Sequence, residues 1–204
     1  MPYDQFNFFK ELARDKLSKS RFEHCLAVAA TSEELAIKFQ VNPEKARLAG
    51  LLHDFYKETD QQTFIDLIKS QHYDLRLLNY NRGVWHGLIG ADILKQEYDF
   101  FDEDILNAIR FHTVCNPQMN NLAKIVFVAD YIEPNRRFPV AKKARKIVEQ
   151  SLDAAVLYEI KMSITYLIDH AAKIFPTMLD TYNSLYTKNL NYQEMIQKVE
   201  KNWK

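Results

Sequence analysis

The sequence predicts an all-α protein, and three observations support this prediction. Only four glycines and six prolines interrupt 204 residues. Apolar residues recur with the 3.6-residue period of an α-helix along most of the chain. Runs that alternate apolar and polar residues, as half-buried strands do, are scarce. The chain contains no repeat, linker or low-complexity segment, so we expect a single domain over residues 1–204.

The expected helices follow one another between recognisable boundaries. Asn42 and Pro43 begin one of them, because Asn is a favoured N-cap and Pro fits the first helical position. The segments NPQMNN at 116–121 and EPNRRFP at 133–139 are expected to be breaks between helices. The helices are expected at about 4–18, 21–39, 43–56, 61–69, 85–98, 103–113, 119–132, 151–172, 177–187 and 191–203. Those from about 151 to 203 are expected to form scaffold and one wall of a pocket.

The composition argues against several classes of function. Hydrophobic residues make up 47% of the chain and charged residues 26%, as in an ordinary globular protein. The formal net charge is zero, which argues against a nucleic-acid polymer or a membrane surface as partner. The N-terminus lacks a signal-peptide pattern, and no apolar run approaches the length of a membrane span. We therefore expect a cytoplasmic enzyme or binding protein, with a homodimer left open.

Five of the expected helices carry a His or an Asp on their apolar face. Residues three or four positions apart share one face of a helix, so each such group should point towards the core. The stripes are His24 with Val28, Thr31 and Leu35; His53 with Ala46, Ala49 and Gly50; His86 with Ile89, Gly90 and Ile93; His112 with Ile105, Ala108 and Ile109; and Asp130 with Val126 and Ala129. His72 and His170 lie off this pattern and are expected to be surface or structural residues.

These inward-facing groups predict a metal site. One buried histidine is usually a core residue with a satisfied hydrogen bond, but an unpartnered buried polar group costs about 1–3 kcal/mol. A cluster of imidazoles and carboxylates is costly unless a cation lies among them. The candidate ligands are His24, His53, Asp54, His86, His112 and Asp130. This set exceeds the needs of one catalytic ion and suits two ions about 3.5–4 Å apart, with Asp54 between them.

The kind of ligand narrows the choice of metal ion. Imidazole and carboxylate ligands without thiolate favour Fe, Mn, Zn or Ni over Cu(I) or a structural zinc. Cys25 and Cys115 show neither CxxC spacing nor a disulfide pattern. Cys25 points about 100° away from His24 around the helix. Cys115 follows His112 by three positions, and we interpret it as a packed thiol.

The order of the ligands resembles that of the HD-domain metallophosphohydrolases, and within them the YqeK family. The segments SRFEHCLAVA, AGLLHDFYKE, WHGLIGADIL, ILNAIRFHT and KIVFVADYIEPNRRFP resemble that family in order and spacing, over about residues 15–185. The resemblance implies a helical HD-domain bundle with its core at about 20–135 and a dimetal site between helices. It also implies two iron ions, with Mn, Zn or Ni as alternatives, and symmetrical hydrolysis of diadenosine tetraphosphate to two ADP.

The resemblance also indicates roles for single residues. Asp54 and Lys57 are the candidate catalytic residues, and Arg21, Lys57, Thr113 and Arg136 are the candidate substrate contacts. Arg110 and Arg137 stay ambiguous. The chain departs from the family pattern at four positions. Cys115 and Val140 replace glycines, and Phe175 and Met178 replace a His and a Thr of a late motif thought to line the nucleotide pocket.

Two other functions stay open at this point. An HD-type hydrolase could act instead on a mononucleotide or a dNTP, since metal ligands alone do not identify the substrate. A non-catalytic HD module could bind a nucleotide without cleaving it, although the intact ligand set argues against this.

Overall fold

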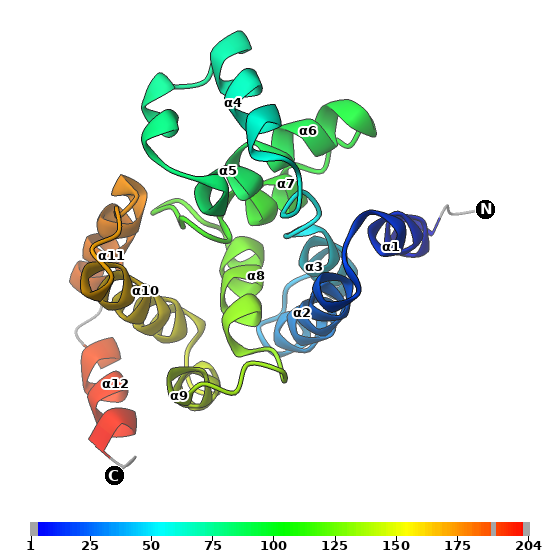
Figure 1. Cartoon of the computed structure of the whole chain (residues 1–204). Coiled ribbons are helices and arrows are strands. Elements are labelled where there is room, and N and C mark those ends of the chain that lie inside the picture. Colours follow the sequence, from blue (N-terminus) through cyan, green and yellow to red (C-terminus); the bar gives the residue numbers. More distant parts are fainter. Residues whose placement is uncertain (1–3, 189–190, 202–204) are drawn as a thin grey trace.

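The computed structural model describes residues 4–188 and 191–201, and all regular structure within them is helical (Figure 1), which confirms the all-α prediction. The α-helices are α1 (Gln5–Lys16), α2 (Lys19–Lys38), α3 (Pro43–Leu52), α4 (Gln61–Ser70), α5 (Arg82–Leu88), α6 (Gly90–Glu97), α7 (Glu103–Phe111), α8 (Asn121–Ile132), α9 (Pro139–Val148), α10 (Leu152–Asp169), α11 (Pro176–Lys188) and α12 (Asn191–Lys201); η1 (Leu75–Asn79) is a short 3-10 helix.

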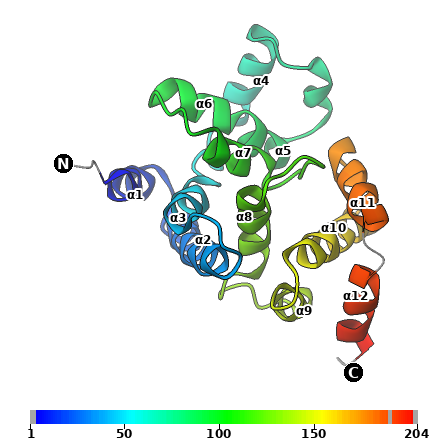
Figure 2. The same cartoon turned by 180° about the vertical axis from the view of Figure 1, so that it is seen from behind.

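Helix α8 lies at the centre of the molecule. Helices α2, α3, α7 and α10 all pack against it. Figures 1 and 2 show α2 and α3 on one side of α8, α10 and α11 on the other, and α4 to α7 across one end. Its sequence, NLAKIVFVADYI, is apolar on nearly every face, as expected for a helix surrounded by others. Asp130, in its last turn, is therefore brought among several helices at once.

Two glycines allow helices to approach closely at the centre. A Cβ atom on Gly50 of α3 would lie 2.9 Å from both Ala29 Cα and Val28 O of α2, so no larger residue fits there. Gly50, one turn before His53, thus lets α2 come close to α3. A Cβ atom on Gly87 of α5 would lie 3.2 Å from the imidazole of His112.

Several expected boundaries were wrong. Helix α9 begins at Pro139, where the sequence had suggested a break, because proline is favoured at the first helical position. The expected helix 85–98 is two helices that meet at Ile89 between Gly87 and Gly90, and glycine is a poor helix former.

Other differences are smaller. Helix α3 ends at Leu52 rather than near 56, and α10 ends at Asp169, before Ala171 adopts a φ of 50°. Residues 202 and 203 of the last expected helix lie outside the described residues. Over the part of the chain that is described, no helix combines the length and the apolar character that crossing a bilayer requires.

Candidate metal centre

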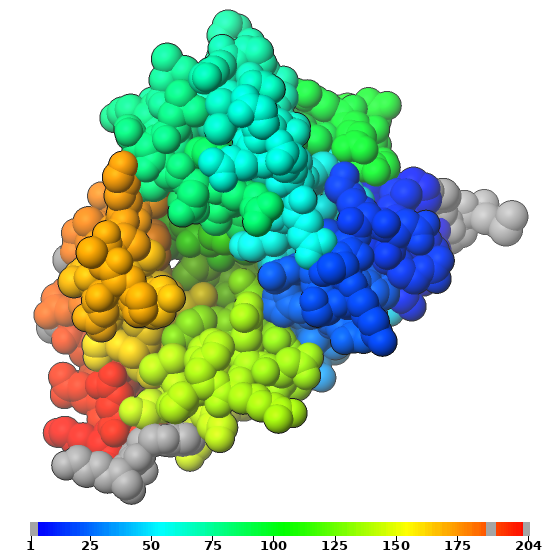
Figure 3. Space-filling view, in the orientation of Figure 1, coloured from blue at the N-terminus to red at the C-terminus, as the bar shows by residue number. Residues whose placement is uncertain are grey.

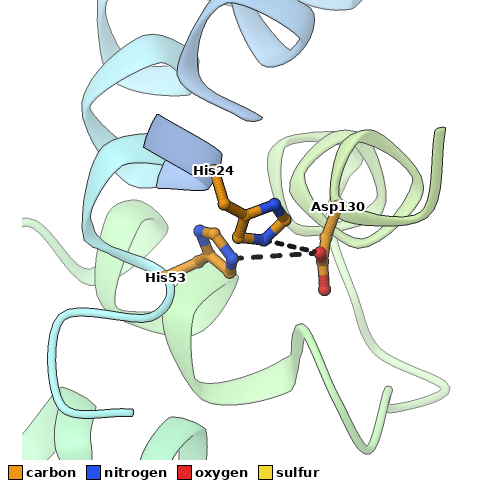
Figure 4. A group of neighbouring side chains, drawn as sticks. All are labelled: His24, His53 and Asp130. Atoms are coloured by element: carbon orange, nitrogen blue, oxygen red, sulfur yellow. Dashed lines mark ion pairs between the residues drawn. The ribbon is translucent and has the colours of Figure 1, made fainter. Parts of the chain in front are cut away.

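The six expected metal ligands come together where helix ends meet. His24 lies in α2, His86 in α5 and Asp130 in α8, whereas His53, Asp54 and His112 directly follow α3 and α7. His24 Nε2 lies 3.1 Å from Asp130 Oδ1, and His53 Nε2 lies 4.0 Å from the same oxygen. Figure 4 shows these three side chains pointing towards one another from separate segments.

Asp54 occupies the middle of this group. Its Oδ1 lies 2.9 Å from His86 Nε2 and 3.5 Å from His112 Nε2. Its Oδ2 lies 3.4 Å from His53 Nε2 and 3.9 Å from His24 Nε2. The two carboxylate oxygens therefore face different histidines, which is the arrangement that a carboxylate between two cations would have.

Hydrogen bonds to the backbone set the tautomers of three histidines. The Nδ1 atoms of His53, His86 and His112 lie 2.7, 2.8 and 2.7 Å from the carbonyl oxygens of Gly50, Arg82 and Ile109. A carbonyl only accepts, so each Nδ1 carries a hydrogen and, in the neutral ring, each Nε2 presents a lone pair. Burial lowers the pKa of His86 to about 4 and also lowers the pKa of His112, which favours the neutral rings.

The donor set fits metal ions. His86 Nε2 and His112 Nε2 lie 2.9 Å apart, and two lone pairs at that distance repel unless a cation lies near both. Buried Nε2 atoms of His24 and His53, and Oδ1 of Asp54, have no hydrogen-bond partner. Two overlapping groups have ligand atoms within 4.8 Å of one another: His24, His53 and Asp130, and His53, Asp54 and His112.

Both carboxyl groups are held in the ionised form. Burial works against ionisation of Asp54, but His53, His112 and His86 outweigh it and lower its pKa well below the usual range. Burial likewise opposes ionisation of Asp130, and the contacts of His24, His53 and Arg136 lower its pKa despite the nearby charge of Asp54. Despite burial, the charge of Asp54 raises the pKa of His53, so positive charge on His53 and on Arg136 favours two carboxylates, the form that ligates metal.

Three cationic side chains surround the carboxylates. Arg21 Nη1 donates to Asp54 Oδ2 at 2.7 Å, and Arg136 Nη2 donates to Asp130 Oδ1 at 2.6 Å. Lys57 Nζ lies 3.3 Å from His86 Nε2 and 3.9 Å from Asp54 Oδ1. The side chains of Arg21, Lys57 and Arg136 are 30%, 30% and 35% exposed, so each touches the centre and still reaches outwards. They balance carboxylate charge, and Lys57 can donate to His86 Nε2, but the buried Nε2 atoms of His24 and His53 have no hydrogen-bond partner.

The structure also places the other residues that the sequence singled out. The buried Oγ1 of Thr113 has no hydrogen-bond partner. Arg110 donates to Asp92 and Asn107, which gives it a structural role, and Arg137 is exposed. Both cysteines are free and buried, and burial raises their pKa values, as expected for packed thiols. His72 and His170 are exposed.

Glu133 was not among the residues expected from the sequence. This carboxylate is buried, and its Oε1 lies 3.3 Å from His24 Nδ1 while its Oε2 accepts from the backbone N–H of Asn135 at 2.7 Å. Glu133 thus contacts Nδ1 of His24, as a backbone carbonyl oxygen contacts Nδ1 of each of the other three histidines. A signal was present in the sequence, since Glu133 follows Asp130 by three positions at the end of the same helix.

Arg145 of α9 was missed as well. Its Nε donates to Ile132 O at 2.7 Å, and its Nη2 donates to Glu133 O at 2.6 Å and to Arg136 O at 2.8 Å. One guanidinium thus holds three carbonyls of the segment that carries Glu133 and Arg136. No sequence signal pointed to it, because α9 itself was not expected.

The structure shows the surroundings of the four residues that depart from the family pattern. Cys115 adopts a φ of 44°, in the left-handed region that favours glycine, and its side chain is buried. Val140 lies in the first turn of α9. The ring of Phe175 packs against Tyr80 with centroids 5.0 Å apart, and Met178 is buried.

Comparisons with known proteins show the family of the chain. Residues 21–135 match the HD domain family. Two curated relatives are named symmetrical bis(5'-nucleosyl)-tetraphosphatase. The one from Bacillus subtilis is 37% identical, over 84% of this chain and 92% of its own length, and the one from Halalkalibacterium halodurans is 37% identical, over 86% and 94%. A solved structure of a predicted HD superfamily hydrolase involved in NAD metabolism from Clostridium acetobutylicum has a TM-score of 0.85 and 32% identity, covering 90% of this chain and 98% of its own.

Proposed function

Because the chain belongs to the HD-domain family, and within it to the branch that contains the symmetrical bis(5'-nucleosyl)-tetraphosphatases, we propose that it hydrolyses diadenosine tetraphosphate to two ADP. The similarity to those relatives over most of both chains carries this proposal. The convergence of four imidazoles and two carboxylates beside three cations supports it chemically.

In the proposed site, His24, His53, Asp54, His86, His112 and Asp130 hold two divalent transition-metal ions. Such ions lower the pKa of a bound water and draw charge from a phosphoryl oxygen. The proposal includes iron as the native metal, with Mn, Zn or Ni as alternatives. The orientation of the imidazoles by their Nδ1 contacts supports it, because a fixed tautomer directs each Nε2 lone pair inwards.

The proposed substrate contacts are Arg21, Lys57, Thr113 and Arg136. A tetraphosphate chain carries several negative charges, and a planar guanidinium can bind two phosphate oxygens at once. Arg21 and Arg136 each contact a proposed metal ligand and remain about one-third exposed, so each can contact a phosphate next to the reacting one. Lys57 lies between Asp54 and His86, where its ammonium can balance charge that develops on the phosphoryl group.

The symmetrical cut requires a particular placement of the phosphate chain. A phosphorus of the central anhydride would have to lie beside the six proposed metal ligands, so that water would replace its bridging oxygen and each half would become ADP. An attack one phosphate further along would release ATP and AMP.

Chromatography of early products from metal-loaded protein tests the reaction. ADP as the sole nucleotide product is expected. Equimolar ATP and AMP would contradict the symmetrical cut, and rapid dephosphorylation of mononucleotides without this cleavage would favour a mononucleotide hydrolase. Elemental analysis of anaerobically purified protein should give about two equivalents of transition metal, as a dimetal site requires. A content well below one equivalent in active protein would contradict the dimetal site.

A further inference from the structure

The segment that follows the proposed metal ligand Asp54 is tied to the start of helix α2 by a carboxylate. Glu58 Oε2 accepts from the backbone N–H of Ser18 at 2.7 Å, and Glu58 Oε1 accepts from Ser18 Oγ at 2.6 Å. Ser18 is the N-cap residue of α2, and it lies 40 positions before Glu58 in the chain. In Figure 3, the cyan atoms of the segment after α3 meet the blue atoms of the first helices at the edge of a hollow in the surface.

These hydrogen bonds belong to a closed ring of contacts. Ser18 Oγ also accepts from the backbone N–H of Arg21, at 3.4 Å. Arg21 Nη1 in turn donates to Asp54 Oδ2 at 2.7 Å. Asp54 precedes Glu58 by four positions, and the turn between them is held by the backbone N–H of Lys57, which donates to Asp54 O at 2.9 Å. The ring therefore begins and ends at Asp54, and it includes the side chain of Arg21.

The charge of Glu58 suits this position. Its hydrogen bonds with Ser18 lower its pKa against the opposing effect of burial, and the positive charges of Arg21 and Arg82 lower it further. A negative charge beside the first turn of a helix is also favoured by the helix dipole. Hydrogen bonds to a charged acceptor are stronger than those between neutral groups. Glu58 therefore fixes the first turn of α2, which carries Arg21, against the segment that carries Asp54.

We propose that Glu58 is a positioning residue for Arg21, holding its guanidinium beside Asp54 so that its other donors can meet a substrate phosphate. The inference rests on the proposed function, in which Arg21 contacts phosphate. The Arg21 side chain is 30% exposed, and among the described residues only its Nη1 is bonded, to Asp54. A guanidinium loses little freedom on binding phosphate when its planar fork is already oriented. Without Glu58, Arg21 keeps its charge but loses the support that orients it.

Calorimetric titration of manganese-saturated protein with inorganic pyrophosphate measures this role. Arg21→Ala should bind pyrophosphate about tenfold more weakly, because a charge-assisted contact is lost. Glu58→Ala should bind it about three- to fivefold more weakly, since Arg21 is present but must be ordered on binding. Glu58→Gln should keep an affinity close to that of the wild-type protein, because its amide oxygen can still accept from Ser18.

Two further variants separate positioning of Arg21 from a general loss of stability. In the Arg21→Ala protein, adding Glu58→Ala should cause no further loss of pyrophosphate affinity, because the residue that Glu58 positions is absent. Asp60→Ala is the matched control. Asp60 Oδ2 accepts from the backbone N–H of Gln62 at 2.8 Å, so this variant also loses a helix cap, that of α4. Its pyrophosphate affinity should stay at the wild-type value.

Unchanged pyrophosphate affinity in Glu58→Ala would overturn the inference, as would an equal loss in Asp60→Ala. A loss that persists in full when Arg21 is already replaced would show that Glu58 does not act through Arg21. Wild-type affinity in Arg21→Ala would also overturn it, because Arg21 would then make no phosphate contact. These binding results are independent of the products of diadenosine tetraphosphate cleavage. The positioning role can therefore fail while the hydrolase stands, and the reverse.

Discussion

His24 differs from the other histidines of the centre in the group that its Nδ1 contacts. A backbone carbonyl accepts from Nδ1 in His53, His86 and His112, whereas His24 Nδ1 faces the Glu133 carboxylate at 3.3 Å. A carboxylate partner fixes the tautomer and orients the ring, as in carboxylate–histidine–metal arrangements. Of the four histidines in the centre, His24 is thus the one whose Nδ1 is oriented by another side chain.

We expect Glu133→Leu to weaken metal binding by about 10- to 100-fold, since His24 loses the partner that orients it. Glu133→Gln should have a smaller effect, because its amide oxygen can still accept from Nδ1. Titration of the protein with metal against a competing chelator measures both. Glu149→Gln, at an exposed carboxylate, is the control, and equal affinities in all three variants would contradict this role.

Asp54 is expected to be indispensable for turnover. Its two oxygens face different histidines, so Asp54→Ala removes a carboxylate that lies near both His53 and His86. Activity should fall below a tenth of the wild-type rate, while circular dichroism should still report a folded helical protein. Some thermal stability should also be lost, because metal binding and folding are coupled. A variant that retains a tenth or more of the rate with two bound metals would show that Asp54 does not link the ions.

At the scale of helices, the contact between α2 and α3 places His24 beside His53. Their rings lie with centroids 5.2 Å apart, and Gly50 makes the approach possible. Gly50→Ala should destabilise the protein by about 1–3 kcal/mol, because the new methyl meets backbone atoms that have little freedom to move. Thermal unfolding measures the change.

Gly83→Ala is the matched control, because its Cβ would meet only the side chain of Asn81. We expect it to lower the melting temperature by less. Equal shifts of the melting temperature in the two variants would mean that the close packing of α2 on α3 does not restrict the size of the side chain at position 50.

Helix α9 acts on the centre through Arg145. This side chain binds the carbonyls of Ile132, Glu133 and Arg136, so it sets the course of the chain after α8. Arg145→Met should leave these carbonyls without their partner and displace Arg136. We expect kcat/KM for diadenosine tetraphosphate to fall about tenfold or more, as small misplacements near a reacting group do, with metal content kept.

Lys142→Met, at an exposed position of the same helix, tests whether loss of any cation of α9 has this effect. Full activity in Arg145→Met would contradict a role of α9 in positioning Arg136.

At the scale of the whole molecule, the metal centre joins segments that lie far apart in the chain. Its proposed ligands come from five places between His24 and Asp130 and meet around the central helix α8. A ligand that binds only the folded state stabilises it, by about 2.7 kcal/mol at a concentration 100 times its dissociation constant. Removing the metals should therefore lower the melting temperature by several degrees.

Differential scanning calorimetry with and without chelator measures this shift, and adding manganese back should reverse it. Asp54→Ala should respond much less to chelator than the wild-type protein. A wild-type melting temperature that does not change on chelation would contradict a metal site shared among these segments.

Features with a local cause were predictable from the sequence. Helical periodicity is a relation between residues three or four positions apart, so it revealed the all-α class and the inward direction of His24, His86 and His112. The cost of burying such groups without a partner then predicted a cation. Pro139 shows the limit of local signals. A proline can mark either a break after one helix or the first residue of the next helix, and only the fold decides between these two roles.

Features that depend on contacts between distant segments came only from the tertiary structure. Arg145 reaches carbonyls 9 to 13 positions earlier in the chain, and Glu133 meets His24 across 109 positions. The sequence by itself determined which side chains face inwards, because one helix fixes that direction. Only the packing of helices against α8 decided which of those side chains meet, since no periodicity along a chain encodes a distance between two of its helices.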